Sequence, residues 1–458
     1  MDVESLTRTR IGCRPGYTAR VSQPQDAELP RKLGLLDATT IVIGTMIGAG
    51  IFVIPSVIAR DLPSTPVILA VWILGGIASF FGALAYAELG AMLPHSGGQY
   101  VYLREAYGPL PAFLTGWTFF FVTQSGSIAA VTVACARFLS YLVPGVPGLL
   151  TWFPVLVIVV LTGINYVGVK QGARVQVLFT ALKLAGLSTL IISAALSPAP
   201  SAIDWTWPAH VSGVSLGAGL LGAFLAYDGW HAIAFIAGEV INPKRNLVLA
   251  LVLGLLATTA VYLAANLAYA SVMTHAEIAA STRVAADTAE RTMGKLGASF
   301  VTLTIVFSMI GAANGTLMTT PRLYFTQARD GLFFKRMAEI HPVYRTPGIS
   351  ILVQGVWTCI LTLSGSYEQL VSYVVVIAWI VHTAVVLGLI VLRRRHPEWE
   401  RPYKVWGYPW APLLFVAFAV WFIVTTFIAR PGTSLAGCGI LLSGIPIYYL
   451  WRRKRVDL

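Results

Sequence analysis

An apolar segment near the N-terminus reads Ile41-Val-Ile-Gly-Thr-Met-Ile-Gly-Ala-Gly-Ile-Phe-Val-Ile-Pro55, and three glycines and a proline interrupt it. A break in a helix frees backbone N–H and C=O groups, which lipid cannot satisfy. Non-helical backbone at membrane depth is therefore stable only where protein or a wet cavity covers it. The centre of this break is Gly48-Ala-Gly50, and we predict that it forms part of the working site.

The composition is that of a membrane protein. Mean hydropathy is +0.73, 56% of the residues are hydrophobic and only 11% are charged, whereas a soluble domain carries roughly 25% charged residues. Apolar runs of about 20 residues, long enough to cross a bilayer, recur along the chain. We predict an all-α membrane protein with twelve transmembrane helices, at approximately 38–58, 66–92, 110–140, 152–168, 175–197, 213–240, 247–272, 297–325, 347–365, 369–392, 409–429 and 435–451.

The net charge of +12 follows from membrane topology rather than from nucleic-acid binding. Most Lys and Arg residues fall in alternate loops, the positive-inside bias of cytoplasmic loops. We therefore predict a multi-pass protein of the cell membrane with both termini cytoplasmic, in contact with membrane lipids and with no nucleic-acid partner. The inner set includes Arg31-Lys32, Lys244-Arg245, Arg393-Arg-Arg395 and Arg452-Arg-Lys-Arg455, and the outer set is Arg60, Arg283, Arg291, Lys295 and Arg430.

The domain organisation is simple. Residues 1–33 are charged throughout and lack the apolar region of a signal peptide, so they are predicted to form a cytoplasmic tail. Residues 34–458 are predicted to form one transmembrane domain. The sequence contains no CxxC, HExxH or Gly-rich phosphate loop, and we expect no cofactor, no metal site and no enzyme activity.

A second interrupted segment reads Gly222-Ala-Phe-Leu-Ala-Tyr-Asp-Gly-Trp230, because Asp-Gly is a turn signal within an apolar run. Spans one and six are thus both broken, each opens a set of five, and their odd–even count gives them opposite orientations. Such a pair indicates the substrate site of an inverted-repeat transporter. We place the repeats at about 38–197 and 213–392, with two extra helices at 409–451. The alternative is that glycines such as those of Gly44-xxx-Gly48 only allow close helix packing.

These motifs also carry a resemblance to a known family. Gly44-Thr-Met-Ile-Gly-Ala-Gly-Ile-Phe52 resembles the first-span signature of the amino acid–polyamine–organocation superfamily, and the L-type amino acid transporter branch in particular is similar along nearly the whole chain from about residue 32. The resemblance implies a LeuT-like fold and an amino acid substrate. The other matching motifs are Tyr86-Ala-Glu-Leu89, Pro94-His-Ser-Gly-Gly-Gln-Tyr100, Ala106-Tyr-Gly-Pro-Leu-Pro-Ala112, Phe224-Leu-Ala-Tyr-Asp-Gly-Trp230, Gly238-Glu-Val-Ile-Asn-Pro243, Ala313-Asn-Gly315, His341-Pro342 and Pro397-Glu-Trp-Glu-Arg-Pro402.

The broken helices suit an amino acid zwitterion. Half-helix N-termini offer free N–H groups to a carboxylate, and half-helix C-termini offer free carbonyls to an ammonium. The expected substrate-binding positions, which the resemblance also implies, are Thr45, Met46, Gly48, Ala49, Gly50, Phe224, Leu225, Ala226 and Asp228, with the amides of Ala49 and Gly50 on the carboxylate and the carbonyls of Thr45, Met46, Leu225 and Asp228 on the ammonium. The expected side-chain pocket comprises Gln124, Ser125, Ser127, Tyr227, Ala378 and Trp379.

Ionisable residues inside spans are functional candidates, because lipid disfavours them. In sodium-coupled LeuT-like transporters a cation ties span one to span eight, and Lys183 resembles its replacement in sodium-independent relatives. We expect its ammonium near Gly44 and near Ser308 or Asn314; a snorkelling lysine or a proton carrier are the alternatives. Asp228 is expected to cap the second half of span six or to contact the substrate ammonium. Several residues keep two interpretations: Glu88 and Glu239 as gate ion pairs or solvated groups, and His231 as a proton site or a structural histidine.

The predicted function is sodium-independent secondary transport of neutral L-amino acids by alternating access, as an exchanger. The alternatives are a proton-coupled amino acid symporter and a transporter of cationic amino acids or amines with the same fold. Some L-type relatives are disulfide-linked to a glycoprotein through an outer-loop cysteine after span three. Residues 142–149 contain no cysteine, so no disulfide-linked heavy chain is expected.

Overall fold

The computed structural model describes residues 28–197, 203–365 and 367–456, and these form helices joined by loops. The elements in chain order are α1 (Leu35–Met46), α2 (Gly50–Asp61), α3 (Thr65–Met92), α4 (Gln99–Tyr107), α5 (Pro109–Thr118), η1 (Phe119–Thr123, a π-helix), α6 (Gln124–Leu142), α7 (Leu149–Val167), α8 (Val169–Ala195), α9 (Gly213–Tyr227), α10 (Ala232–Phe235), η2 (Ala237–Glu239), α11 (Pro243–Val272), α12 (His275–Ala280), α13 (Val284–Thr319), α14 (Pro321–Arg329), η3 (Lys335–Ala338), α15 (Gly348–Ser364), α16 (Tyr367–Arg395), α17 (Trp410–Ala429) and α18 (Pro431–Val456).

The protein is an all-helical multi-pass membrane protein. Within the described residues, ten helices are long and apolar enough to cross a bilayer, when α1–α2, α5–α6 and α13–α14 are each counted as one. The sequence predicts twelve spans, and two of them contain no single helix long enough to be counted, for structural reasons. The sixth span is divided into α9, of 15 residues, and α10, of 4 residues, and the ninth corresponds to α15, of 17 residues.

Both predicted breaks are present. The first helix ends at Met46, Ile47 leaves helical geometry with φ −78° and ψ 83°, and α2 begins at Gly50. In the sixth span α9 ends at Tyr227, with Asp228 extended and Gly229 at φ 116°. A positive φ of this size is open to glycine and strained for other residues. The Asp-Gly pair is therefore what interrupts this helix.

The two breaks lie against each other because residue 229 is a glycine. Their backbones are too close for a side chain at this position. A Cβ on Gly229 would lie 2.8 Å from the Thr45 carbonyl oxygen. Gly44 instead allows α8 to approach α1, since a Cβ on Gly44 would lie 1.9 Å from Nε2 of Gln176 on α8. The packing interpretation thus holds for Gly44, whereas Gly229 allows the contact between the breaks.

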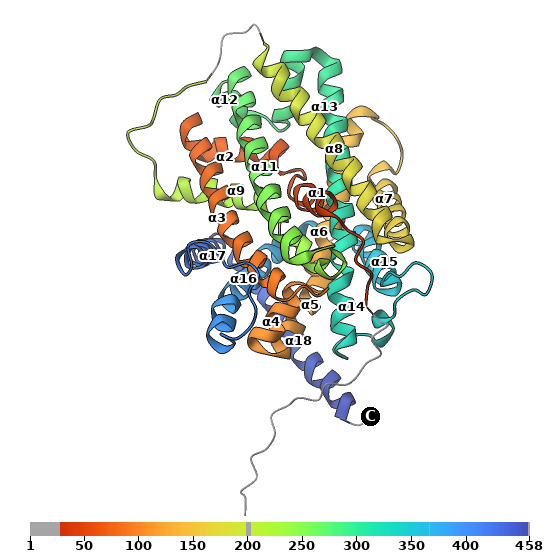
Figure 1. Ribbon diagram of the computed structural model, residues 1–458. Coiled ribbons are helices and arrows are strands. Elements are labelled where there is room, and N and C mark those ends of the chain that lie inside the picture. Colours follow the sequence, from red (N-terminus) through yellow and green to blue (C-terminus); the bar gives the residue numbers. More distant parts are fainter. Residues whose placement is uncertain (1–27, 198–202, 366, 457–458) are drawn as a thin grey trace, which may run out of the picture.

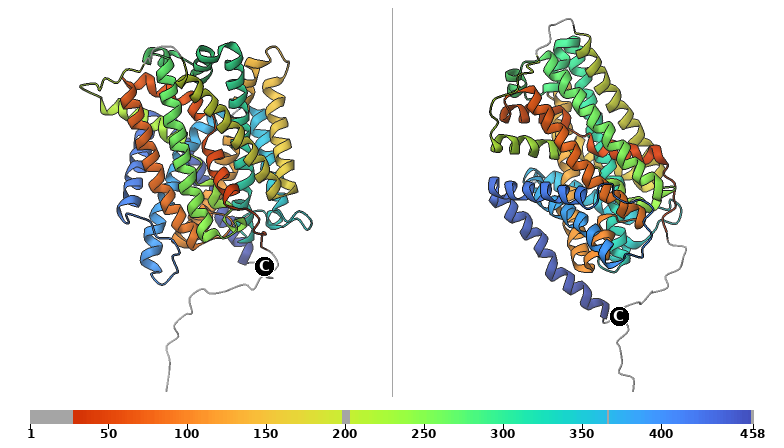
Figure 2. Two further views of the ribbon diagram at one scale, coloured as in Figure 1. Left: turned by 45° about the horizontal axis from the view of Figure 1, so that its top comes forward. Right: turned by 60° about the vertical axis from the view of Figure 1, so that its left-hand side comes forward.

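The helices form one bundle with two distinct ends. Figure 1 shows α12 at one end, and α4, α14 and the C-terminal end of α18 at the other. The segment that leads into α1 belongs to this second end, since Lys32 and Leu33 donate backbone hydrogen bonds to Glu239 of η2. The last two helices, α17 and α18, lie on the outside of the bundle (Figure 2, right).

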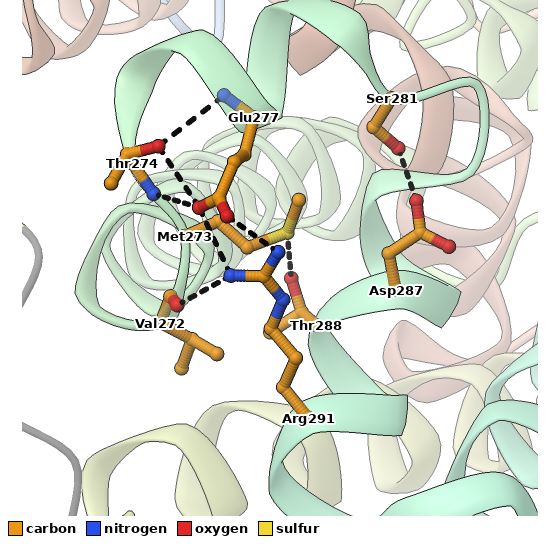
Figure 3. Close-up of polar contacts among 8 residues, drawn as sticks. All are labelled: Val272, Met273, Thr274, Glu277, Ser281, Asp287, Thr288 and Arg291. Carbon is orange, nitrogen blue, oxygen red and sulfur yellow. Dashed lines mark hydrogen bonds and ion pairs between the residues drawn. The ribbon is translucent and has the colours of Figure 1, made fainter.

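The short helix α12 is fastened at its end of the bundle by a capping box and an ion pair (Figure 3). Glu277 accepts hydrogen bonds from the Thr274 backbone at 2.8 Å and from Nη2 of Arg291 at 2.8 Å. These contacts, that of Arg291 above all, lower the pKa of Glu277 from 4.5 to about 2. Arg60 of α2 donates to the Ala279 carbonyl at 2.8 Å, so α12 also covers the end of α2.

This geometry predicts a pH-dependent contribution of Glu277 to stability. A lowered pKa means that the contribution is complete above about pH 4.5 and is lost as the pH falls through about 2. Glu277→Gln should therefore lower the melting temperature at about pH 6, and its difference from the wild type should shrink in acid. The measurement is thermal unfolding in detergent over a pH series. Glu290→Gln, an exposed glutamate on α13, is the control, and a Glu277→Gln difference that does not change with pH would contradict the assignment.

Candidate functional site

A cavity of about 670 Å³ lies where the two breaks meet, and helices α6, α13 and α16 complete its wall. It collects most of the predicted site residues. Those that line it are Thr45, Met46, Gly48, Ala49, Gly50, Gln124, Ser127, Leu225, Ala226, Asp228, Ala378 and Trp379.

The other predicted residues lie behind this wall. Phe224 is 1% exposed and packs edge-to-face on Trp379, with ring centroids 5.3 Å apart. Leu225, the next residue, turns toward the cavity and is 42% exposed. Ser125 donates to the Phe120 carbonyl at 2.7 Å within the π-helical turn. The remaining four are fully buried and do not line the cavity: Tyr227, Lys183, Ser308 and Asn314.

One side of the cavity presents the N-terminus of α2. The first N–H groups of a helix have no partner within it and carry the positive end of its dipole. Ala49 and Gly50 line the cavity at this point. Gly50 also touches α9, since a Cβ there would lie 3.1 Å from Cα of Ala226. This end of α2 can receive an anionic group. The space between α2 and α9 depends on the lack of a side chain at Gly50.

The cavity lining also includes the C-terminal ends of α1 and α9, and Tyr262 of α11 joins them. Its hydroxyl lies 3.0 Å from the Met46 carbonyl and 2.8 Å from the Ala226 carbonyl. Met46 O also accepts from the amide of Gly48 at 2.9 Å. The Met46 carbonyl is thus partly engaged, which differs from the expectation that it is free. No sequence signal marks Tyr262, because a tyrosine in an apolar helix is typical of core packing.

Lys183 on α8 contacts the backbone of the first break. Its Nζ donates to the carbonyls of Gly44 at 2.9 Å, Ile47 at 2.5 Å and Ser308 at 3.1 Å. An ammonium has three donors, so all of them are satisfied by α1 and α13. Ser308 adds hydroxyl contacts to Ile47 O at 2.8 Å and Gly48 O at 3.0 Å. The predicted contacts near Gly44 and Ser308 are confirmed, and this buried, fully paired lysine does not snorkel.

Asn314 belongs to a different network. Its amide donates to the Gly172 carbonyl at 3.1 Å and to Oε1 of Gln176 at 2.8 Å, and it accepts from Asn165 at 2.9 Å. These bonds join α7, α8 and α13 below Lys183. Of the two span-eight positions proposed for the ammonium, Ser308 is the one that it contacts.

Asp228 occupies the second break and faces two histidines. Its Oδ1 lies 3.5 Å from Nδ1 of His231 and 3.6 Å from Nε2 of His382 on α16. The residue that precedes α10 is His231, and that helix has no side-chain cap. The expectation that Asp228 caps it is therefore wrong, because the carboxylate turns toward α16. The histidine of α16 was not predicted from the sequence.

The two ends of the cavity differ. Toward α12 its lining extends to Tyr141, Thr282 and Arg283, so it reaches that end of the bundle. At the other end Glu239 and Arg322 form a fully buried ion pair at 2.7 Å, and Arg322 also donates to Met318 O.

A second ion pair, between Glu88 of α3 and Arg393 of α16, lies at that same end at 2.5 Å. Glu88 is itself fully buried. Both glutamates are therefore ion-paired rather than solvated, and their role as a gate stays a prediction.

Comparison with known sequences identifies the family of this chain. The family model of amino acid permeases matches residues 33–449. The b(0,+)-type amino acid transporter 1 of Mus musculus is 33% identical over 98% of this chain and 93% of its own length. The serine/threonine exchanger SteT of Bacillus subtilis is 31% identical over 94% and 99%, and the large neutral amino acids transporter small subunit 2 of Mus musculus is 31% identical over 93% and 82%. This chain belongs to the amino acid permease family of the amino acid–polyamine–organocation superfamily, and it is an amino acid transporter rather than an enzyme.

Proposed function

We propose that this protein exchanges neutral L-amino acids across the cell membrane by alternating access, without sodium. The observation that carries the proposal is the position of Lys183, whose three donors occupy carbonyls of α1 and α13 where a coupling cation would otherwise bind. The name of one relative, serine/threonine exchanger, supports the exchange mode, and that of another supports neutral substrates.

The substrate is assigned to the cavity between the breaks. Its carboxylate binds the amides at Ala49 and Gly50, where the dipole of α2 favours negative charge. Its ammonium binds carbonyls at the ends of α1 and α9. The side chain extends toward residues that combine apolar surface with a few polar groups, as small-molecule sites commonly do: Gln124, Ser127, Leu225, Ala378 and Trp379.

The proposed architecture is a LeuT-like inverted repeat with twelve spans in one domain. Repeat one runs from α1 to α8 and repeat two from α9 to α16, and each begins with a broken helix, which supports the assignment. The end with Arg393, Arg394 and Arg395 is assigned to the cytoplasm, together with both termini. No disulfide-linked heavy chain is proposed, since residues 142–149 contain no cysteine.

A second candidate is proton-coupled symport, and one observation favours it. Asp228 and His231 line the cavity, and histidine is the side chain that most readily changes charge near neutral pH. A carboxylate at the cavity also suits a cationic side chain, which is the other alternative. Both remain amino acid transport by the same fold.

The test is uptake of labelled amino acids into proteoliposomes. Vesicles loaded with unlabelled amino acid should take up at least tenfold more label than empty ones. The reason is that the binding site of an exchanger faces the outside again only after it has bound a substrate from inside. Replacing external sodium by choline should leave this uptake unchanged. Uptake into empty vesicles that rises with an inward proton gradient would favour symport, and a requirement for sodium would refute the proposed role of Lys183.

The two glycines of the first break provide a matched test of the carboxylate site. A methyl group on Gly50 would lie 3.1 Å from Ala226 Cα, whereas one on Gly48 would make an ordinary 3.7 Å contact with Cβ of Ala312. Gly50→Ala should therefore lower exchange at least tenfold, and Gly48→Ala should retain most of it. Equal activity of the two variants, at equal amounts of folded protein in the vesicles, would remove the assignment.

Lys183→Met tests whether the Lys183 ammonium takes the place of a coupling cation. The substitution keeps an unbranched side chain but removes the ammonium, so the Gly44 carbonyl loses its side-chain donor, whereas Ile47 O keeps the Ser308 hydroxyl. A buried group left unsatisfied costs about 1–3 kcal/mol. We expect a lower melting temperature and loss of most exchange. Arg174→Met on the same helix is the control, because Arg174 is an exposed residue away from the first break. Full exchange by Lys183→Met would make the residue a bystander.

A further inference from the structure

We propose that Asp228, His231 and His382 bind one divalent transition-metal ion of the Zn²⁺ class at the edge of the substrate cavity. This inference does not depend on the mode of transport, because it concerns an ion other than the transported amino acid.

The three ligand atoms have a spacing that suits such an ion. One oxygen of Asp228 and one ring nitrogen from each histidine lie within 4.8 Å of one another. The two distances from the carboxylate are 3.5 Å and 3.6 Å. Two ligands in tetrahedral positions around Zn²⁺, each at about 2.05 Å, lie about 3.3 Å apart. Small side-chain movements would therefore complete the site.

The histidine nitrogens that face this point lack other partners. Nδ1 of His231 and Nε2 of His382 are buried, and neither makes a hydrogen bond within the described residues. Their distances to Asp228 exceed those of a normal hydrogen bond. Buried polar atoms are nearly always hydrogen-bonded or bind an ion or water, so two of them directed at one carboxylate indicate a ligand between them.

The surroundings of His382 also suit a metal ligand. Its other nitrogen, Nδ1, lies 3.0 Å from the Tyr86 hydroxyl and 3.1 Å from the Gln99 side-chain amide nitrogen. Gln99 Oε1 has no hydrogen bond within the described part of the chain. Turning this amide by 180° places its oxygen against Nδ1, which then donates a proton to it. The Nε2 lone pair is left to face Asp228, the arrangement found in metal-binding histidines.

The ion would join two parts of the transporter. Asp228 and His231 belong to the break of the sixth span, and His382 belongs to α16. With three protein ligands, a fourth position remains open, as in zinc sites that exchange ligands. Asp228 and His231 line the cavity, so this position is reached from it. The sequence lacks a metal motif because the ligands come from helices far apart in the chain.

The test is a Zn²⁺ titration of the purified, untagged, chelator-treated full-length protein in detergent, by competition with a fluorescent chelator. We expect one saturable site. His231→Gln, His382→Gln and Asp228→Asn should each weaken binding at least tenfold, and Gln99→Leu about tenfold through the orientation of His382. His210→Gln, an exposed histidine away from the cluster, should bind like the wild type.

Co²⁺ supplies a second, structural readout. Bound in place of Zn²⁺, it should give visible absorption bands of a four-coordinate site, and His382→Gln should remove them. The absence of stoichiometric Zn²⁺ binding by the wild type overturns the proposal, whatever the variants do. Equal binding by the wild type and a monodisperse His382→Gln variant overturns it as well, since the ion would then lie elsewhere.

Discussion

The broken first helix depends on the ammonium of Lys183. Interrupting α1 after Met46 frees carbonyl groups in a dry part of the protein, where each unsatisfied group costs about 1–3 kcal/mol. Lys183 meets the carbonyls of Gly44 and Ile47 and links them to Ser308 on α13. A bound metal cation would make the same contacts only at sufficient ion concentration, whereas a covalently attached ammonium is always present.

Tyr262 shows how the site is both held together and left receptive. A hydroxyl has one proton to donate, yet it lies within reach of two carbonyls, those of Met46 and Ala226. At any moment one of the two carbonyls lacks that donor. Both residues line the cavity, so the proposed ammonium site would offer an acceptor there without breaking the connection between the two helix ends.

The sequence predicts those features that break the rules for a membrane span. Glycines and an Asp-Gly pair interrupt apolar runs, and Lys183 places a charge in one, so these positions stand out and the structure confirms the breaks and the lysine contacts. Tyr262 and His382 obey the ordinary pattern of apolar helices, and only the tertiary packing gives them partners. Leu225 is exposed and Phe224 is buried because of the way α9 is rotated about its axis. That rotation depends on the neighbouring helices, so the sequence of α9 alone does not predict it. The predicted tail lies largely outside the described residues.

The ion pairs at the end of the bundle away from α12 set a condition on the proposed transport cycle. Separating a buried pair such as Glu239–Arg322 leaves two unpaired charges, at about 3–5 kcal/mol if the site stays dry. A pair that separates as water enters avoids most of this penalty, because each charge is then hydrated. Opening toward the second end must therefore admit water to Glu239 and Glu88 as their helices move, or else move each pair as a unit. Only a pair that separates favours the state in which the cavity reaches the α12 end, and substrate binding then has to offset that preference before the other state forms.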